Sequence, residues 1–202
     1  SGVGSNLTIV NLEDTTLYGK IEKVIDIVDL NTNDIVNSAP GLPVVITPDT
    51  ATGVDYRGAL VYVNDLEGKV TKFNLTNMPK DQLGAPISLY DSTTLFTAGS
   101  NTTNGRYMYH SMDAAIGQTT GNLWLFSGTG DYERLTEKKT AIENILLGIK
   151  DKDFPYYRNI NIPAEADDLS VCNDTTGDSG GALCPGENDL GWHIILENSE
   201  KV

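Results

Sequence analysis

ALVYVNDLEGKVTKFNL, residues 59–75, decides the fold class of this chain. An apolar run that is rich in valine and tyrosine, Leu60–Val63, comes first. Asp65 and Gly68 then supply turn chemistry, and a second run alternates in polarity over Val70–Leu75. Two runs of this kind around a short loop with glycine are typical of a β-hairpin. We therefore expect an antiparallel pair of strands here.

A similar unit follows at residues 121–135, GNLWLFSGTGDYERL. The pattern predicts an aromatic-rich strand at Leu123–Phe126, a turn at Gly128–Gly130 and a second strand through Tyr132. Two hairpins of this style in one chain predict repeated four-stranded antiparallel sheets, as in a β-propeller. A closed propeller needs more blades than 202 residues supply, at roughly 40–50 residues each. We therefore expect a partial propeller or a fragment of one.

The rest of the sequence consists of further predicted strands and turns. Four apolar residues of 142–149 are spaced as on a helix, but the run NILLGIKD also suits a buried strand. We predict a short polar helical or loop segment at 137–143 and a strand at 144–149. No linker of biased composition divides the chain, so we predict one all-β domain over residues 1–202. Other strands are expected at residues 7–12, 17–24, 42–47, 87–96, 106–116 and 191–196.

The chain is acidic, with 28 Asp and Glu against 14 Lys and Arg and a net charge of −14. No basic stripe is available to neutralise phosphates, so we predict no nucleic-acid partner. The same charge disfavours an anionic membrane surface. We also predict no membrane span, because no run of about 18 apolar residues occurs. An acidic surface mainly keeps a protein soluble.

The two cysteines, Cys172 and Cys184, enclose the Gly- and Asp-rich segment NDTTGDSGGAL. This segment is flexible enough to let the two sulfurs meet, so we predict a disulfide and a location outside the cytoplasm. The alternative is two unrelated buried thiols. A structural zinc site is disfavoured, because two cysteines and two scattered histidines lack paired ligand spacing.

Residues 177–181 in that segment spell GDSGG, the sequence around the nucleophilic serine of chymotrypsin-like proteases. That chemistry needs a histidine to accept the proton of Ser179 and an aspartate to orient the histidine. The chain has only His110 and His193. His110 is too near Ser179 in sequence to come from a separate barrel, and His193 lies in a strand-like context, GWHII. We interpret GDSGG as a structural loop and keep a secreted serine protease as an alternative.

Calcium is the metal to consider in an acidic β protein, because it binds carboxylate oxygens in loops. The loop of residues 49–55 carries Asp49 and Asp55 but lacks carboxylates at its third and fifth positions. Asp151 and Asp153 form a carboxylate pair without a following Gly or Glu. We predict no firmly bound cofactor and keep Asp49 and Asp55 as the calcium candidates.

Two other features have structural interpretations. Trp124 and Trp192 have apolar strand neighbours and are predicted to be core residues rather than ligand platforms. The GTG sequence at 128–130 lacks the lysine and the helix that a phosphate-binding loop uses.

Four segments of the chain together resemble a known family. VYVNDLEGKVTKFNL at 61–75 is similar to the pattern YVGD-x-x-G-x-x-W-K-F-D-L, and GTGDY at 128–132 is similar to GTG-x-Y. LGIKD at 147–151 resembles YGI-x-D, and 191–202, GWHIIL with the final SEKV, resembles GW-x-x-x-L-x-x-x-GEKV. The order of the four also agrees. These are patterns of the C-terminal β-propeller region of the PilY/PilC family, proteins associated with type IV pilus tips.

This resemblance implies a non-enzymatic, extracellular component of a type IV pilus that acts in pilus assembly and surface adhesion. Its implied partners are pilins or minor pilins, the remaining parts of a larger tip protein, and a host or surface ligand. The calcium loop of some members is reduced here to Asp49 and Asp55. The sequence ends at EKV without the family's large N-terminal region, so we expect a fragment or one piece of a processed protein. A plain carbohydrate- or protein-binding β domain is a further alternative.

Overall fold

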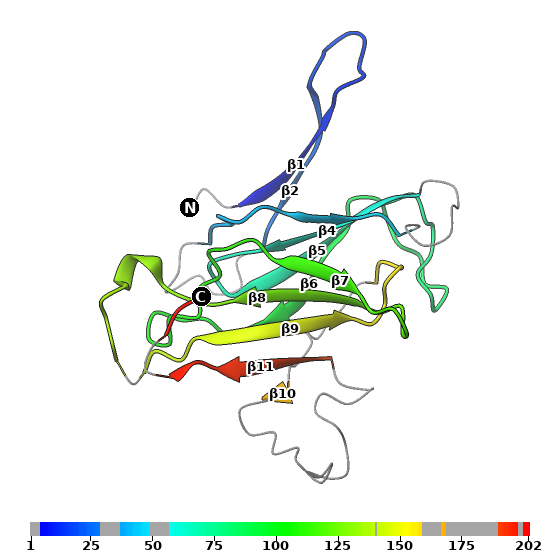
Figure 1. Cartoon of the computed structure of the whole chain (residues 1–202). Coiled ribbons are helices and arrows are strands. Elements are labelled where there is room, and N and C mark those ends of the chain that lie inside the picture. The colour runs from blue at the N-terminus through cyan, green and yellow to red at the C-terminus, as the bar shows by residue number, and fades with distance from the viewer. Residues whose placement is uncertain are drawn as a thin grey trace.

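The computed structural model describes residues 5–28, 37–48, 57–139, 141–158, 167–168, 190–197 and 200–202. Within these residues the chain is all-β, with one short 3-10 helix and no α-helix, which confirms the predicted fold class (Figure 1). The strands are β1 (Asn6–Asn11), β2 (Lys20–Asp26), β3 (Val44–Ile46), β4 (Gly58–Asn64), β5 (Lys69–Thr76), β6 (Ser92–Thr97), β7 (Asp113–Ile116), β8 (Leu123–Gly128), β9 (Ile145–Asp151), β10 (Asp167–Asp168) and β11 (Gly191–Ile195), and the helix is η1 (Tyr132–Arg134).

β4 and β5 form the hairpin that the sequence predicts, and they pair antiparallel over their whole lengths. The Asp65 side chain builds the turn between them. Its Oδ1 accepts hydrogen bonds from the backbone N–H groups of Glu67 at 3.1 Å and Lys69 at 3.2 Å. Gly68 has a φ of +66°, and a Cβ there would lie 2.7 Å from the Arg106 carbonyl oxygen. Glycine is therefore the residue that this turn accepts without strain.

The strands form repeated antiparallel sheets. β3, β4, β5 and β6 make a four-stranded sheet in sequence order, and β7, β8, β9 and β11 are also ordered as in the sequence within a second sheet. β10 joins the second sheet as a parallel neighbour of β11, and the β1–β2 hairpin is a third, two-stranded sheet. None of these sheets closes into a barrel. Consecutive four-stranded meanders are consistent with a partial, propeller-like fold.

The two large sheets pack face to face around the main core (Figure 1). Leu60 and Tyr62 of β4 meet Leu125 of β8 and Leu147 and Ile149 of β9, and all five side chains are fully buried. Residues at alternate positions of a strand share one face of its sheet, which is why the period-2 pattern identifies these side chains. Burying each one contributes about 1.5–3 kcal/mol to stability.

The β1–β2 hairpin covers the opposite face of the first sheet. Ile25 and Ile27 pack there against Val61, Val63 and Phe73 in a second apolar cluster. β4 and β5 are therefore buried on both faces. This explains why β4 has an uninterrupted apolar run, since only strands with one face in solvent alternate between apolar and polar residues.

A buried ion pair joins the two large sheets. Lys72 Nζ on β5 lies 2.6 Å from Asp151 Oδ2 at the end of β9, and both side chains are fully buried. The Tyr62 hydroxyl donates to the same carboxylate oxygen at 2.7 Å, and Lys72 also donates to the Tyr156 carbonyl at 2.8 Å. Burial and the Asp151 charge raise the pKa of Tyr62 well above its ordinary value. The phenol therefore stays protonated and continues to donate.

A second buried lysine ties the hairpin turn to the third sheet. Lys69 Nζ lies 2.7 Å from Asp65 Oδ2 and 2.9 Å from Glu67 Oε2. It also donates to the Val28 carbonyl, just after β2, at 2.5 Å. Burial raises the pKa of Asp65, and the nearby Lys69 charge opposes this shift without cancelling it.

The prediction of a second hairpin is wrong for its second strand. Tyr132 begins the 3-10 helix η1, and β8 pairs with β7 and β9 instead. The cause is Asp131, whose side chain accepts a 2.9 Å hydrogen bond from the Glu133 N–H and so caps the start of the helix. The strand predicted at 144–149 in preference to a helix is confirmed as β9.

Most other predicted strands are confirmed with shifted bounds. Those expected at 17–24, 87–96 and 106–116 begin later, at Lys20, Ser92 and Asp113. The delay before β2 has a visible cause, because Asp14 Oδ1 accepts hydrogen bonds from the N–H groups of Thr16 and Leu17 and holds a turn. The strands expected at 7–12, 42–47 and 191–196 correspond to β1, β3 and β11.

We expect Asp151→Asn to lower the free energy of unfolding by about 3–5 kcal/mol, because it leaves the Lys72 ammonium buried without a countercharge. The double variant Lys72→Met with Asp151→Leu removes both charges and should recover part of this loss, because the buried Tyr62 hydroxyl then loses its acceptor. Urea denaturation of the three proteins measures both effects. An Asp151→Asn variant as stable as the wild type would contradict the buried pair.

The raised pKa of Asp65 predicts a pH dependence. Its stabilising contribution is complete below the ordinary aspartate pKa and is lost as the pH rises through the higher pKa of the folded state, because the ionised carboxylate is desolvated. The wild type should therefore lose stability relative to Asp65→Asn as the pH increases from 3 to 7. Urea midpoints at several pH values test this, and a difference that stays constant or changes in the opposite sense would count against it.

Candidate functional site

Loops from different parts of the chain meet at one end of the second sheet. The loop between β6 and β7 joins the segment between β8 and β9 through the Gly130 N–H, which donates to the Tyr107 carbonyl at 2.9 Å. The last residues join the same segment, because the Val202 N–H donates to the Thr129 carbonyl at 3.2 Å. We call residues 98–112, 128–139, 141–144 and 200–202 the loop cluster.

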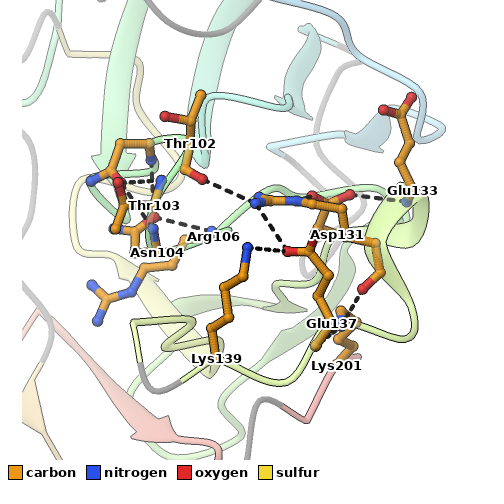
Figure 2. Close-up of polar contacts among 11 residues, drawn as sticks. Thr102, Thr103, Asn104, Arg106, Asp131, Glu133, Glu137, Lys139 and Lys201 are labelled. Carbon is orange, nitrogen blue, oxygen red and sulfur yellow. Dashed lines mark hydrogen bonds and ion pairs between the residues drawn. The ribbon is translucent and has the colours of Figure 1, made fainter.

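Asp131 is the centre of the polar contacts in the loop cluster (Figure 2). Its side chain is nearly fully buried and pairs with the Arg134 guanidinium, while its other oxygen caps η1. Arg134 also donates to the Thr102 carbonyl at 3.2 Å. The hydrogen bond that Arg134 donates to the Asp131 carboxylate raises the pKa of Arg134 above its ordinary value. Arg134 is thus held between the two loops as a permanent positive charge.

The last residues of the chain are held by backbone acceptors. Lys201 Nζ donates to the carbonyl groups of Arg134 at 2.8 Å and Glu137 at 3.3 Å, and Figure 2 shows its side chain reaching below η1. A Cβ on Gly128 would overlap the Val202 side chain, and one on Gly130 would lie 2.9 Å from Lys201 Cβ. Residues 201–202 therefore pack directly against the glycines of the GTG sequence.

A reciprocal pair of asparagines shapes the loop after β6. Asn101 Oδ1 accepts from the Asn104 N–H, and Asn104 Oδ1 accepts from the Asn101 N–H, each at 2.9 Å. Arg106 follows this turn and reaches across to the Glu143 carbonyl through its Nε at 2.7 Å. Side chains that satisfy local backbone groups in this way make a loop rigid.

Three tyrosines and a histidine form a partly exposed aromatic group on the loop cluster. The rings of Tyr107 and Tyr109 meet edge to face at 6.4 Å, and those of Tyr109 and Tyr132 at 5.4 Å. His110 Nε2 is in hydrogen-bond contact with the Tyr132 hydroxyl. Desolvation, followed by the charges of Asp131 and Glu133, raises the pKa of Tyr109. We call Tyr107, Tyr109, His110 and Tyr132 the tyrosine surface.

The tyrosine surface has side chains that are suited to contacts with another molecule. Tyrosine combines a flat apolar ring with a hydroxyl that can hydrogen-bond, and such side chains are enriched at interfaces. Tyr132 is 39% exposed, so a partner can reach it. The T-shaped contacts hold the rings in place before any partner binds.

Several residues singled out in the sequence lie outside the described residues. Asp49 and Asp55, the calcium candidates, are among them, as are Cys172, Cys184 and Ser179. The disulfide, the calcium site and the GDSGG loop therefore stay predictions. In the part of the chain that the structure describes, no group of three or more His, Cys, Asp or Glu side chains could hold a metal ion.

Both histidines lie in the described part of the chain, and each has an identified neighbour. His110 belongs to the tyrosine surface, and His193 lies on β11 opposite Leu147 of β9.

Both carboxylates of the pair near the end of β9 have polar partners. Asp151 is paired with Lys72, and Asp153 accepts from Gln82 Nε2 at 2.5 Å.

The two tryptophans are not in the main core, contrary to the prediction. Trp124 and Trp192 are half-buried on the face of the second sheet that is turned away from the first. They alternate with the core residues of their strands, which places them on the outer row together with Phe126. The Trp192 indole lies against Gly148, where a Cβ would come within 2.6 Å of the ring.

Asp131 and Arg134 organise the loop cluster and were not among the residues predicted from the sequence. The available signal was an aspartate three residues before an arginine at the start of a short helix, which is a capping pattern. Tyr109 and Tyr132 carried no signal, since their proximity depends on how the two loops fold.

Comparison of the chain with protein-family models, with curated proteins and with solved structures found no match. The described residues include no helix that is long and apolar enough to cross a membrane.

We expect Gly128→Ala to destabilise the protein by about 1–3 kcal/mol, because the new methyl group occupies the space of the Val202 side chain. Val202→Gly vacates that space, so the double variant should show a smaller effect of Gly128→Ala than the single variant does. Thermal unfolding of the wild type, the two single variants and the double variant gives a double-mutant cycle that measures the coupling between the two residues. Strictly additive effects would show that the two residues do not touch.

Proposed function

We propose that this chain is a non-enzymatic, extracellular part of a type IV pilus that acts in pilus assembly and surface adhesion. In this proposal it resembles the β-propeller-like region of the tip-associated PilY/PilC proteins. One observation carries the proposal. The segments that resemble the family are also the segments on which the tertiary structure depends.

Each of these segments makes a defined contact. The turn of the 61–75 segment contains the buried Lys69 with its two carboxylate partners. The GTG segment receives Val202 and Lys201, and Gly148 of the LGIKD segment receives the Trp192 ring of the GW segment. Motifs that match in order and also meet in space favour a shared fold over chance similarity.

The loop cluster is the proposed contact surface for pilins or minor pilins. Loops on a rigid sheet scaffold are where proteins usually carry their binding residues. The tyrosine surface supplies aromatic rings and hydroxyl groups, and Asp131 and Arg134 fix the loop that presents Tyr132. A host or surface ligand is the second partner that the proposal includes.

The surroundings of His110 support a non-enzymatic role. A serine nucleophile needs a histidine whose ring nitrogen is directed at the serine hydroxyl. His110 Nε2 is instead in contact with the Tyr132 hydroxyl. The secreted-protease alternative would require a rearrangement of the tyrosine surface or the use of His193 on β11.

Binding of soluble pilin and minor-pilin domains to the immobilised chain tests the proposal. We expect saturable binding that weakens at least about tenfold in the Tyr109→Ala, Tyr132→Ala double variant, because buried tyrosines carry much of an interface's energy. Tyr18→Ala is the matched control, because Tyr18 is 83% exposed at the far end of the β1–β2 hairpin. Binding by this control should match the wild type.

Two results would overturn the proposal. The first is the absence of binding to every pilin and minor pilin tested. The second is hydrolysis of a fluorescent casein substrate that Ser179→Ala abolishes, which would establish the protease alternative.

A further inference from the structure

Among the strands that the structure describes, β1 is an edge strand with a free side. Its partner within the described ranges is β2, and no other described strand pairs with it. The Ile27 N–H donates to the Ser5 carbonyl at 2.9 Å, so residues 5 and 27 are a hydrogen-bonded pair. Hydrogen-bonded and non-hydrogen-bonded pairs alternate from there along the two strands. Leu7 and Ile9 therefore exchange hydrogen bonds with β2, whereas Asn6 and Thr8 direct their backbone N–H and C=O groups away from it. These groups form a short template for another strand.

β1 lacks the residues that usually protect such an edge. Its sequence, NLTIVN, has no charge and no proline, whereas β2, KIEKVID, carries charges of both signs. Natural sheets block edge pairing with charges, prolines or very short strands. Two other uncharged edge strands are described, but β3 has three residues and β6 is largely buried. β1 is thus both unprotected and accessible.

The outer face of the hairpin also exposes apolar side chains. Leu7, Ile9 and Ile25 face the first sheet, so the alternate residues Val10 and Val24 face away from it. Val10 is 42% exposed and Val24 46%, and Ile21, which pairs with Val10, is 59% exposed.

Figure 1 shows the hairpin extending beyond the body of the sheets. A two-stranded sheet is only marginally stable in water, and a third strand adds both hydrogen bonds and apolar cover.

We propose that the free edge of β1 accepts an extended segment of a partner polypeptide as a third strand. Unpaired backbone N–H and C=O groups in a row are matched by another extended backbone, and this is the basis of strand addition. Alternate side chains of the added strand would lie beside Thr8 and Val10 and extend the apolar outer face.

The charge of the chain selects the partner segment further. Glu13 and Asp14 follow the end of β1, and Lys20 Nζ lies 3.6 Å from Asp14 Oδ2. Residues 5–28 still carry four acidic side chains against two lysines, and the whole chain carries −14. The favoured occupant is therefore an uncharged extended segment with basic flanking residues. This binding mode is independent of the pilus proposal, because it requires an extended segment and not a particular protein.

The probe for this proposal is a synthetic peptide, acetyl-Lys-Lys-Asn-Leu-Thr-Ile-Val-Asn-Lys-amide, with a fluorescent label. Its uncharged centre copies β1, and its ends are basic. We expect saturable binding to the full chain in fluorescence anisotropy. We also expect slower hydrogen exchange at the amides of Asn6 and Thr8, since these are the outward donors.

Two variants of β1 test the edge. Thr8→Pro removes the outward N–H and leaves the bonds of Leu7 and Ile9 to β2 in place, so binding should weaken at least about tenfold. Thr8→Lys adds a protecting charge and should also weaken binding. Thr119→Lys, at an exposed threonine between β7 and β8 that lies outside the loop cluster, is the matched control for charge. Unchanged exchange protection of the Leu7 and Ile9 amides will show that the hairpin stays folded in the variants.

Three outcomes would overturn the proposal. One is no saturable binding of the peptide, and another is equal binding by the wild type and Thr8→Lys. The third is a dimer in sedimentation experiments without peptide that Thr8→Lys dissociates, because the edge would then belong to a second copy of the chain. None of these outcomes depends on whether pilins bind at the tyrosine surface.

Discussion

Burial of the β4–β5 hairpin on both faces is the constraint on which the rest of the structure depends. One row of its side chains, including Tyr62 and Lys72, faces the second sheet, and the alternate row, including Val61 and Phe73, faces β1 and β2. A shift of one residue in the pairing would exchange the two rows and place an unpaired lysine in an apolar cluster. Lys72 and Asp151 therefore select one register. We infer that their contribution is to specificity more than to net stability, as is known for some buried polar groups.

Local sequence pattern was sufficient to predict the β4–β5 hairpin, because alternation and a glycine turn depend only on residues that are close in the sequence. At β9 the spacing of the apolar residues also suited a helix, and the strand was preferred because the rest of the chain was predicted as strands and turns. Asp131 shows where this approach fails. A single aspartate that caps the next residues changed a predicted strand into a 3-10 helix, and alternation carries no information about such a cap.

The contacts between distant segments could not be predicted in the same way. Lys69 and Lys72 lie on β5, which alternates in polarity. Lysines on such a strand are usually exposed, yet both are fully buried. Their burial depends on acidic and carbonyl partners that the fold supplies. The tyrosine surface has the same origin, since Tyr109 and Tyr132 belong to different loops. By contrast, the residues chosen for chemical reasons, Asp49, Asp55, Cys172 and Cys184, lie outside the described residues and stay predictions.

The contact of Val202 and Lys201 with the GTG segment has a consequence for the order of folding. β3 to β6 and β7 to β9 pair with strands that follow them directly, so these meanders close short loops and form at low entropic cost. The contact between Val202 and Thr129 joins segments that are far apart in sequence and must wait until both are in place. We therefore infer that this contact forms after the meanders. Val202 is 38% exposed, so the contact can open while the sheets remain folded, and the glycine backbone beneath it then becomes accessible to solvent.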